Sequence, residues 1–594
     1  MTGRRCFSRR LRKRALLLLA LPSLWAAGPA AAYRVEIEAP PELADMLKTH
    51  LDISRYRERE DISVDQFNYM VETVGDQVRR LASTEGYFDP KTTATVDAPL
   101  AAEATSEDLD ARTVRVRVEA GARTLVTSVD VDFTGAIADE DRERLEALRR
   151  NWGLPAGQPF RQETWAKAKD DTLFALQSEK YYAARLTRSQ ARIDPEAQEA
   201  VLDARYDSGP AYTLGPLEIT GLRRYPAQII HNVNPLNEGE PYSVNRLLEL
   251  QRAIQNQPYF SNVMVDLGDE PDPVNAPVKV RVREYPAHRV NAGVGYATDT
   301  GAQVEGRYSY FNLFNRAWVF DSQMRIEQRR QYAFAEIAMP PDEKTYRHSV
   351  YGSIDRTDLE GVDLRSWRVG VKRARTRERF DTAIALDLYY DDLRPETGAR
   401  QLSKALVPSY SWTRRNVDDP LFPRRGNIIN AQVGVAVSPL LTDQTFGRVY
   451  GRIRQYFPVG SRDLVIARGE VGAILTSGSS RNVPASLRFR AGGNDSVRGY
   501  GYQSIGQRDG ASVLPTKFLV TGGLEYQYWF RREWGAAAFY DVGTATNNWP
   551  DRKLYHGIGF GARWRSPVGP VNVDLAYGVQ DRRIRPHISL GVAF

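Results

Sequence analysis

The second half of the chain is dominated by segments in which apolar and polar residues alternate. After Tyr285-Pro286 helical periodicity disappears, and period-two stretches occupy 381–390, 427–437, 452–457, 487–490 and 571–579. In the second of these stretches one face is mostly polar or small, and the other holds Ile429, Ala431, Val433, Val435 and Val437. Alternation indicates β-strands, and an apolar face opposite a polar one is typical of the wall of a transmembrane barrel.

The last segment repeats this pattern. Its apolar face holds Ile588, Leu590, Val592 and Phe594, and outer-membrane barrels generally end in an aromatic residue. A soluble β-sandwich also has alternating strands, but the terminal Phe594, the Trp and Tyr residues near strand ends and an export signal at the N-terminus favour the barrel. At about 10 residues per strand, residues 286–594 predict a transmembrane antiparallel barrel of about 14–18 strands, with sixteen as the expected number.

Residues 33–285 repeat one small pattern three times. Each repeat opens with a short alternating strand, passes through helical stretches to an aromatic pair, and closes with a second alternating strand. The opening strands are 34–38, 129–133 and 217–220, the aromatic pairs are at 87–88, 181–182 and 259–260, and the closing strands are 114–118, 201–206 and 278–282. This order predicts three small α+β domains in tandem, at 33–120, 121–208 and 209–285.

Residues 1–32 have the layout of a secretory signal peptide. A basic stretch from Arg4 to Arg14 precedes an apolar run from Ala15 to Ala27, and Ala30-Ala31-Ala32 supplies small residues for cleavage before Tyr33. The apolar run is about 13 residues long and is therefore too short for a membrane anchor, which needs roughly 20.

Removal of this segment changes the charge and the chemistry of the chain. The whole chain carries a net charge of +7, and residues 1–32 hold seven basic and no acidic side chains, so the mature chain is close to neutral. Net basicity therefore gives no support to a nucleic-acid partner. The only cysteine, Cys6, leaves with the signal, so the mature chain is expected to hold neither a disulfide nor a thiol nucleophile.

No arrangement of residues indicates catalysis or metal binding. The 6 histidines are scattered, without an HExxH motif or an i, i+4 pair, and no GxSxG elbow occurs. The stretch 557–561 superficially resembles a nucleotide-binding loop, but it lacks a glycine at the required spacing and a following helix, so its alternation predicts a barrel strand. We therefore expect no enzymatic activity, no cofactor and no metal.

Four motifs near the C-terminus resemble a known family. Ser496-Val497-Arg498-Gly499-Tyr500, preceded by Phe489-Arg490-Ala491-Gly492-Gly493, resembles the loop signature of the outer-membrane assembly and two-partner-secretion superfamily. Segments 522–526, 539–543 and 563–570 resemble late barrel strands of that family, and the N-terminal repeats resemble its polypeptide-transport-associated (POTRA) domains. The resemblance covers essentially the whole mature chain, and it implies an outer-membrane barrel preceded by periplasmic POTRA domains.

The number of repeats selects a branch of this family. The BamA branch usually carries five POTRA domains and two-partner-secretion transporters carry two behind a plug helix, so three repeats resemble the TamA branch, the outer-membrane subunit of the translocation and assembly module. That resemblance implies an inner-membrane-anchored periplasmic partner of the TamB kind, docked on the first POTRA domain. The other implied partners are unfolded outer-membrane client proteins and outer-membrane lipid.

The loop motif also has a physical interpretation. A long loop that threads back into a wide barrel needs an anchor, and the guanidinium of Arg498 offers a planar fork that a carboxylate meets bidentately. The family pattern implies Asp541 as that carboxylate, with Glu525 as a second candidate. Gly499 permits a tight turn beside the wall, and Tyr500 packs there. The alternative is an exposed loop whose arginine is solvated.

The ends of the barrel suggest a mechanism. A barrel closes only if its first and last strands pair, and unpaired strand edges accept further strands. Because glycine weakens strands, the expected seam is soft, and its residues are Gly293, Val294 and Gly295 in the first strand and Gly591, Val592 and Phe594 in the last. We predict that the seam opens laterally and that client strands pair with the exposed edge.

This mechanism defines the functional hypothesis and its alternative. The expected function is an assembly and translocation factor that inserts or secretes β-barrel proteins such as autotransporters. The alternative is a two-partner-secretion pore for one dedicated exoprotein.

Overall fold

The structure, a computed structural model, describes residues 33–59, 61–97, 109, 112–268, 272–439, 441–567 and 569–590. The predicted signal peptide and the seam residues Gly591, Val592 and Phe594 lie outside the described residues. Two compact units make up the chain: residues up to Thr213 with Pro241–Val244, and all the others. Among the described helices, none is long and apolar enough to cross a bilayer.

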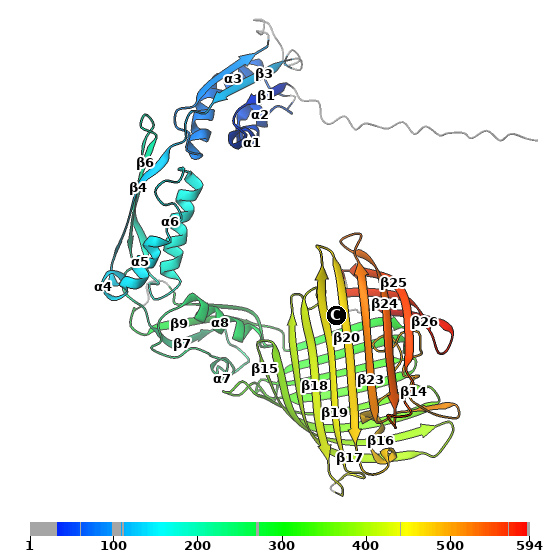
Figure 1. The fold of residues 1–594 in the computed structure, drawn as a ribbon. Coiled ribbons are helices and arrows are strands. Elements are labelled where there is room, and N and C mark those ends of the chain that lie inside the picture. The colour runs from blue at the N-terminus through cyan, green and yellow to red at the C-terminus, as the bar shows by residue number, and fades with distance from the viewer. Residues whose placement is uncertain are drawn as a thin grey trace, which may run out of the picture. The chain divides into compact units, whose positions relative to one another are not determined.

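The first unit holds two small α+β domains built on one plan (Figure 1). Each has a three-stranded sheet whose opening strand runs parallel to the closing strand, which lies in the centre, in the orders β1-β3-β2 and β4-β6-β5. The first domain contains β1 (Arg34–Glu38), α1 (Pro41–His50), α2 (Asp52–Arg55), α3 (Val64–Thr84), β2 (Lys91–Val96) and β3 (Thr113–Glu119). The second contains β4 (Leu125–Thr134), α4 (Ala136–Glu140), α5 (Arg142–Arg150), α6 (Gln162–Gln177), β5 (Arg185–Asp194) and β6 (Glu199–Asp207).

Alternating apolar residues of the central strand form the core of the first domain. Val114, Val116 and Val118 lie on one side of β3 because side chains in a strand alternate between faces, and all three are buried. They share a core with Phe67 and Val74 of helix α3. The alternation in the sequence therefore marks the face of the sheet that the helices cover.

The third small domain follows the same plan and belongs to the second unit together with the barrel. Its sheet has the order β7-β9-β8, and its elements are β7 (Leu214–Thr220), α7 (Gln228–His231), α8 (Val244–Gln255), β8 (Phe260–Asp266) and β9 (Ala276–Glu284). The Tyr259 hydroxyl donates to the Ala317 carbonyl at 2.7 Å, and the Asn232 amide donates to the Pro341 carbonyl at 2.8 Å. The turns at these two carbonyls therefore lie on the barrel rim that faces this domain.

Sixteen antiparallel strands form the barrel, which confirms the predicted fold and strand number. The wall runs in sequence order and is coloured from green to red in Figure 1. Its strands are β10 (His288–Ala297), β11 (Gly301–Leu313), β12 (Trp318–Glu327), β13 (Arg330–Ala338), β14 (Arg347–Leu359), β15 (Val362–Arg377), β16 (Phe380–Pro395), β17 (Gln401–Val417), β18 (Gly426–Ala436), β19 (Phe446–Val459), β20 (Asp463–Leu475), β23 (Phe518–Tyr528), β24 (Trp534–Thr546), β25 (Tyr555–Ser566), β26 (Gly569–Gly578) and β27 (Arg583–Leu590).

The outer surface of the barrel is apolar. Large hydrophobic side chains such as Val290, Ile354, Val435 and Phe560 are exposed, whereas the predicted polar residue of β18, Asn430, donates to the Thr413 hydroxyl of the neighbouring strand at 2.8 Å. A band of exposed apolar side chains around a closed sheet is the surface that lipid covers.

One predicted strand is wrong. The alternating stretch 487–490 belongs not to the wall but to the long connection between β20 and β23, where it follows the short helix η3 (Ala485–Leu487). Leu487, Arg488 and Phe489 are all buried. Arg488 hydrogen-bonds to Gln401 of β17 and Phe489 stacks on Tyr450 of β19, so consecutive residues of this stretch both contact the lumen side of the wall and its period of two does not mark a membrane face.

Helix α3 provides a test of the first domain. Its N-terminus is a capping box, in which the Gln66 amide donates to Ser63 Oγ at 3.2 Å and the Ser63 amide donates to Gln66 Oε1 at 3.0 Å. We expect Ser63→Ala to lower the free energy of unfolding by about 1 kcal/mol, because a backbone donor loses its partner. Urea denaturation of the segment 33–120 measures this, with Ser83→Ala near the other end of the helix as the control, and equal losses in the two variants would contradict it.

Candidate functional site: the lumen loop and the barrel seam

Residues 476–517, which connect β20 to β23, fold back into the barrel; we call them the lumen loop. The loop contains η2 (Ser480–Asn482), η3 and a small hairpin of β21 (Gln507–Asp509) and β22 (Ser512–Leu514). Val497 and Tyr500 at its inner part are almost completely buried. The hairpin is tied to the barrel rim, where the Ser512 hydroxyl donates to the Gly361 carbonyl at 2.7 Å. The loop therefore occupies the lumen and is not an exposed loop in solvent.

Arg498 contacts three carboxylates of the barrel wall. Its Nε lies 2.8 Å from Asp541 Oδ2, and its Nη1 lies 2.6 Å from Glu525 Oε2 and 3.1 Å from Asp574 Oδ2. Its guanidinium carbon also lies 3.3 Å from the centre of the Phe539 ring. Arg498 is 4% exposed and Asp541 is fully buried, so these contacts replace water around the charge. The loop arginine thus lies beside both carboxylates that the motif implied, and beside a third.

Two arginines of the wall complete this group. Arg468 of β20 lies 2.6 Å from Asp541, and Arg563 of β25 lies 2.5 Å from Asp574 and 2.9 Å from Glu525. We call the six residues the clasp: Arg468, Arg498, Arg563, Glu525, Asp541 and Asp574. Three cations face three anions, so the clasp buries no net charge, which is the condition under which buried ions are tolerated.

The backbone of the loop packs directly on glycines of the wall. Gly499 has φ +93, and a Cβ there would lie 2.7 Å from the amide nitrogen of Gly578. A Cβ on Gly557 would lie 1.9 Å from the Arg498 carbonyl oxygen. Beyond this contact the Tyr500 hydroxyl donates to the His556 carbonyl at 3.0 Å. The glycine and tyrosine of the motif therefore fix how closely the loop approaches β25 and β26.

Where both strands are described, the first and last strands of the barrel pair near the end of β10. Among the described residues a single facing pair joins β10 to β27, between Ala297 and Ser589, whereas every residue of β15 faces a partner on β16. The predicted seam residues Gly293, Val294 and Gly295 pair with β11, and within the described part of β27 they have no partner. The described part of β27 ends at Leu590, so pairing of Gly293, Val294 and Gly295 on this edge falls outside the described residues.

A residue of the lumen loop joins the two sides of this seam. The Asn494 amide donates to Asp299 Oδ2 at 3.1 Å, in the turn that follows β10. The Asn494 side chain donates to the Ile588 carbonyl of β27 at 3.2 Å, and its Oδ1 lies 2.7 Å from His587 Nδ1. We call these contacts the Asn494 bridge. They support the seam from inside the barrel, in addition to the facing pair of Ala297 and Ser589 and to the Ile588 amide, which donates to Thr298 Oγ1 at 3.1 Å.

The carboxyl group of the Asn494 bridge has an unusual pKa. Burial raises the pKa of Asp299 from 3.8 to about 6, the hydrogen bond from Asn494 opposes this, and the nearby charge of Asp495 adds to it. Asp299 therefore changes its charge near neutral pH, at the place where the loop meets the seam.

The family follows from comparison with known proteins. The family model described as the Omp85 superfamily domain matches residues 278–594, and a POTRA model, described as a surface antigen variable number repeat, matches residues 212–285. This chain belongs to the Omp85 superfamily. It is accordingly an outer-membrane protein whose POTRA domains lie in the periplasm.

Relatives of this Omp85 protein include outer membrane protein assembly factors BamA. The factor from Nitratidesulfovibrio vulgaris is 24% identical over 510 residues, which cover 81% of this chain and 63% of the relative. The factor from Neisseria meningitidis serogroup B is 19% identical over 596 residues, covering 87% and 72%. The chain thus spans 63% of the length of the first of these relatives.

A solved structure shows the same fold. The crystal structure of BamA from Haemophilus ducreyi lacking POTRA domains 1–3 aligns with a TM-score of 0.67 at 16% identity, covering 79% of this chain and all of that chain. The rim that contacts the third small domain is the periplasmic one, because POTRA domains are periplasmic. The lumen loop connects strands at the opposite rim, on the cell-surface side.

Sequence analysis missed several residues of the site. Asp574, Arg563 and Arg468 of the clasp were not identified, and neither was Asn494. A signal existed for the first three, since each is a charged residue at a position of alternating strands where the lumen face is expected.

Among the described residues, no group of three or more His, Cys, Asp or Glu side chains is arranged so that it could hold a metal ion.

Loss of Arg498 is expected to release the loop. Arg498→Ala leaves three buried carboxylates facing two guanidiniums, and removing one partner of a buried pair costs about 3–5 kcal/mol. We expect the lumen loop of the purified variant to be cut by proteinase K under conditions in which the unchanged protein is protected. Arg508→Ala, on the exposed side of the same loop, is the matched control. Equal protection in all three proteins would show that the clasp does not hold the loop.

The seam is expected to respond to pH. The pKa of Asp299 lies above 3.8 in the closed seam, so its stabilising contribution is complete below that value and is lost as the pH rises through about 6. Spin labels at Val290 and Ile584, both exposed, should give a broader distance distribution at about pH 7.5 than at about pH 5. Asp299→Asn should remove the difference, and a pH effect of the same size in that variant would refute this origin.

Proposed function

We propose that this protein is an outer-membrane assembly and translocation factor of the TamA type, which inserts or secretes β-barrel proteins through its lateral seam. The observation that carries the proposal is the seam itself, where one facing pair joins β10 to β27 among the described residues. An open strand edge presents unpaired backbone donors and acceptors, and in a bilayer these groups need partners. A strand of a client protein supplies them.

The strand β10 is suited to receive such a client. It pairs along its whole length with β11, and on its other edge one facing pair joins it to the described part of β27. Gly293 and Gly295 carry no side chain there, and Val294 points outward and is 70% exposed. In the proposal β27 separates from this edge, and a client strand that pairs with β10 by β-augmentation gains the backbone hydrogen bonds of that edge.

The hydrogen bonds of the Asn494 bridge must break before the seam opens. Full separation of β10 from β27 breaks the hydrogen bonds of Asn494 to Asp299 and to Ile588, together with the direct ones between Thr298 and Ile588. Asn494 lies four residues before Arg498 in the lumen loop. A loop that is fixed by the clasp therefore keeps Asn494 in position beside the seam. Seam opening in the proposed mechanism therefore begins with release of Asn494.

The small domains support the choice of the TamA type. Three α+β domains precede the barrel, each with a three-stranded sheet that has two edges. In the proposal these edges receive unfolded outer-membrane client proteins, and the first domain docks an inner-membrane-anchored periplasmic protein of the TamB kind. Outer-membrane lipid surrounds the seam and is the third partner. The proposal assigns no enzymatic activity, cofactor, metal or nucleic acid to the protein.

A disulfide across the seam tests this function. Ala297 and Ser589 face each other on antiparallel strands, at a separation of about 4.5–5.5 Å that a disulfide spans. The only native cysteine is Cys6, so the pair Ala297→Cys and Ser589→Cys forms a single defined link. We expect the oxidised protein to lose at least about tenfold in client insertion into proteoliposomes, because β10 and β27 can no longer separate to admit a client strand. Reduction should restore it.

The control locks two strands that are already paired. Ser322 and Ala335 face each other on β12 and β13, and a disulfide between cysteines at these positions should leave insertion unchanged. Client insertion that persists in the oxidised seam variant would contradict the mechanism of lateral opening. Secretion of a soluble exoprotein through the locked barrel would instead favour the dedicated pore.

A further inference from the structure

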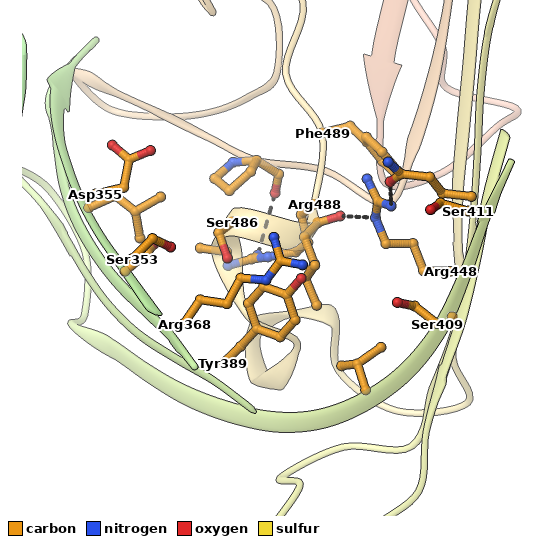
Figure 2. A pocket seen from close by; sticks show the side chains of 18 of the residues that line it. Ser353, Asp355, Arg368, Tyr389, Ser409, Ser411, Arg448, Ser486, Arg488 and Phe489 are labelled. Atoms are coloured by element: carbon orange, nitrogen blue, oxygen red, sulfur yellow. Dashed lines mark hydrogen bonds between the residues drawn. The ribbon is translucent and has the colours of Figure 1, made fainter. Parts of the chain in front are cut away.

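A second part of the barrel lumen, away from the clasp, contains a polar cavity. It has a volume of about 600 Å³ and lies between the wall formed by β13 to β19 and the lumen loop. Figure 2 shows Arg368, Tyr389 and Arg448 from the wall around Arg488 and Phe489 of the loop. Ligand cavities in proteins typically measure about 300–1,000 Å³, so this space is large enough for a small molecule or a lipid headgroup.

The cavity carries an excess of positive charge. Six cationic side chains line it but only two carboxylates do, Asp355 and Glu470. Carboxylates neutralise three of the cations: Arg330 lies 2.5 Å from Asp355, Arg368 lies 2.8 Å from Asp387, and Lys372 lies 3.0 Å from Glu336. The remaining three are Arg448, Arg488 and Arg490, and among the described residues none of them has a carboxylate within ion-pair distance.

These three arginines contact only uncharged oxygens of the protein. Arg448 Nε donates to the Leu487 carbonyl at 3.0 Å, and Arg448 Nη1 donates to Gln432 Oε1 at 3.2 Å. Arg490 Nη1 donates to the Val513 carbonyl at 3.2 Å. Each guanidinium has five donors, so several donors of each remain for another acceptor.

Arg488 is the most deeply placed of the three. It is 8% exposed, its Nη2 donates to Gln401 Oε1 at 3.1 Å, and its Nε has no hydrogen-bond partner in the described structure. The buried carboxylate of Asp391 accepts a hydrogen bond from the Ser486 amide at 2.7 Å, and it attracts Arg488 only from beyond ion-pair distance. A buried charge without a counter-ion is costly. The protein thus keeps three cations together at a cost that a bound anion offsets.

The other side chains of the cavity narrow the choice of anion. Hydroxyl groups of Ser353, Ser409 and Ser411 line the same cavity, with Ser409 and Ser411 on the side of Arg448 and Ser353 on the side of Asp355 (Figure 2). Arginine forks combined with hydroxyl donors suit a tetrahedral phosphate, which offers several acceptor oxygens in different directions. A carboxylate offers two oxygens in one plane and uses fewer of these donors.

We propose that this cavity binds a phosphate-bearing anion, held between Arg448 of the wall and Arg488 and Arg490 of the lumen loop. The anion neutralises the uncompensated charge and ties the loop to strand β19. The phosphate belongs either to a phospholipid headgroup or to a free phosphate. The site does not depend on opening of the seam, because neither seam strand lines the cavity.

The simpler alternative is that the arginines only fasten the loop by their hydrogen bonds to its carbonyls. Both interpretations predict that loss of Arg448 loosens the loop. Only the anion site predicts saturable binding of phosphate, and only that site predicts that phosphate protects the loop from proteolysis. Measurements of phosphate binding and of proteolysis in the presence of phosphate therefore distinguish the anion site from simple fastening of the loop.

The experiment uses the mature protein in a phosphate-free detergent, with folding checked by heat-modifiable migration on gels. Inorganic phosphate and glycerol 3-phosphate are titrated and followed by phosphorus NMR line broadening, and proteinase K cleavage of the loop is measured with and without each probe. The variants are Arg448→Gln in the wall and Arg490→Gln in the loop. Arg356→Gln is the matched control, because Arg356 pairs with Asp363 at 3.1 Å and does not line the cavity.

We expect saturable binding by the unchanged protein and by the control, and affinity weakened about tenfold or more in each cavity variant, since each loses a charge-assisted contact. Glycerol 3-phosphate binding together with phospholipid retained through purification, and lost in Arg448→Gln, identifies a headgroup. Binding of inorganic phosphate alone identifies the free anion. Binding that is not saturable, that is equal in Arg448→Gln, or that acetate competes for equally overturns the proposal.

Discussion

The arrangement of the lumen depends on one buried guanidinium. Arg498 is carried into the barrel by a loop, and a charge at 4% exposure must find carboxylates there or remain in water. It finds them on β23, β24 and β26, three different strands of the wall. Because each strand contributes one acceptor, the contact that places the loop also fixes the positions of those strands relative to one another. The clasp therefore both fixes the position of the loop and joins the strands β23, β24 and β26 to one another.

A histidine, His587, connects the part of the loop that the clasp anchors to the seam. The Gly499 amide donates to His587 Nε2 at 2.9 Å, and His587 Nδ1 lies 2.7 Å from Asn494 Oδ1. An accepting Nε2 places the ring proton on Nδ1, which then donates to the Asn494 oxygen and leaves the Asn494 amide free to donate to Ile588. His587 thus joins the clasp to the Asn494 bridge. The last strand pairs along its described length with β26, and on its lumen side the loop contacts it through His587 and through the Ile588 carbonyl.

The sequence predicted the wall of the barrel better than its contents. Alternation identified strands such as β16 and β18 because lipid and lumen impose opposite polarities on successive residues. The same rule failed at 487–490, where alternation arose inside the lumen. Asp541 and Glu525 were reached through the motif, but Asp574 was not, because its place beside Arg498 depends on the register of β26 with β25, and alternation alone does not fix which residues face across strands. Asn494 lacked any pattern of its own.

The two halves of the lumen differ in how they treat charge, and this difference has a physical consequence. In the clasp three cations meet three carboxylates, so the loop is fixed there by the protein alone. Beside β19 the loop meets the wall through Arg448, whose protein partners are a carbonyl and an amide oxygen, neither of them charged. An ion pair adds the attraction between two opposite charges to the hydrogen bond, so the loop is held more firmly at the seam side of the lumen than at the cavity. An anion in the cavity strengthens the weaker attachment and leaves the stronger one unchanged, which makes the cavity the place where a ligand alters the mobility of the loop without disturbing the clasp.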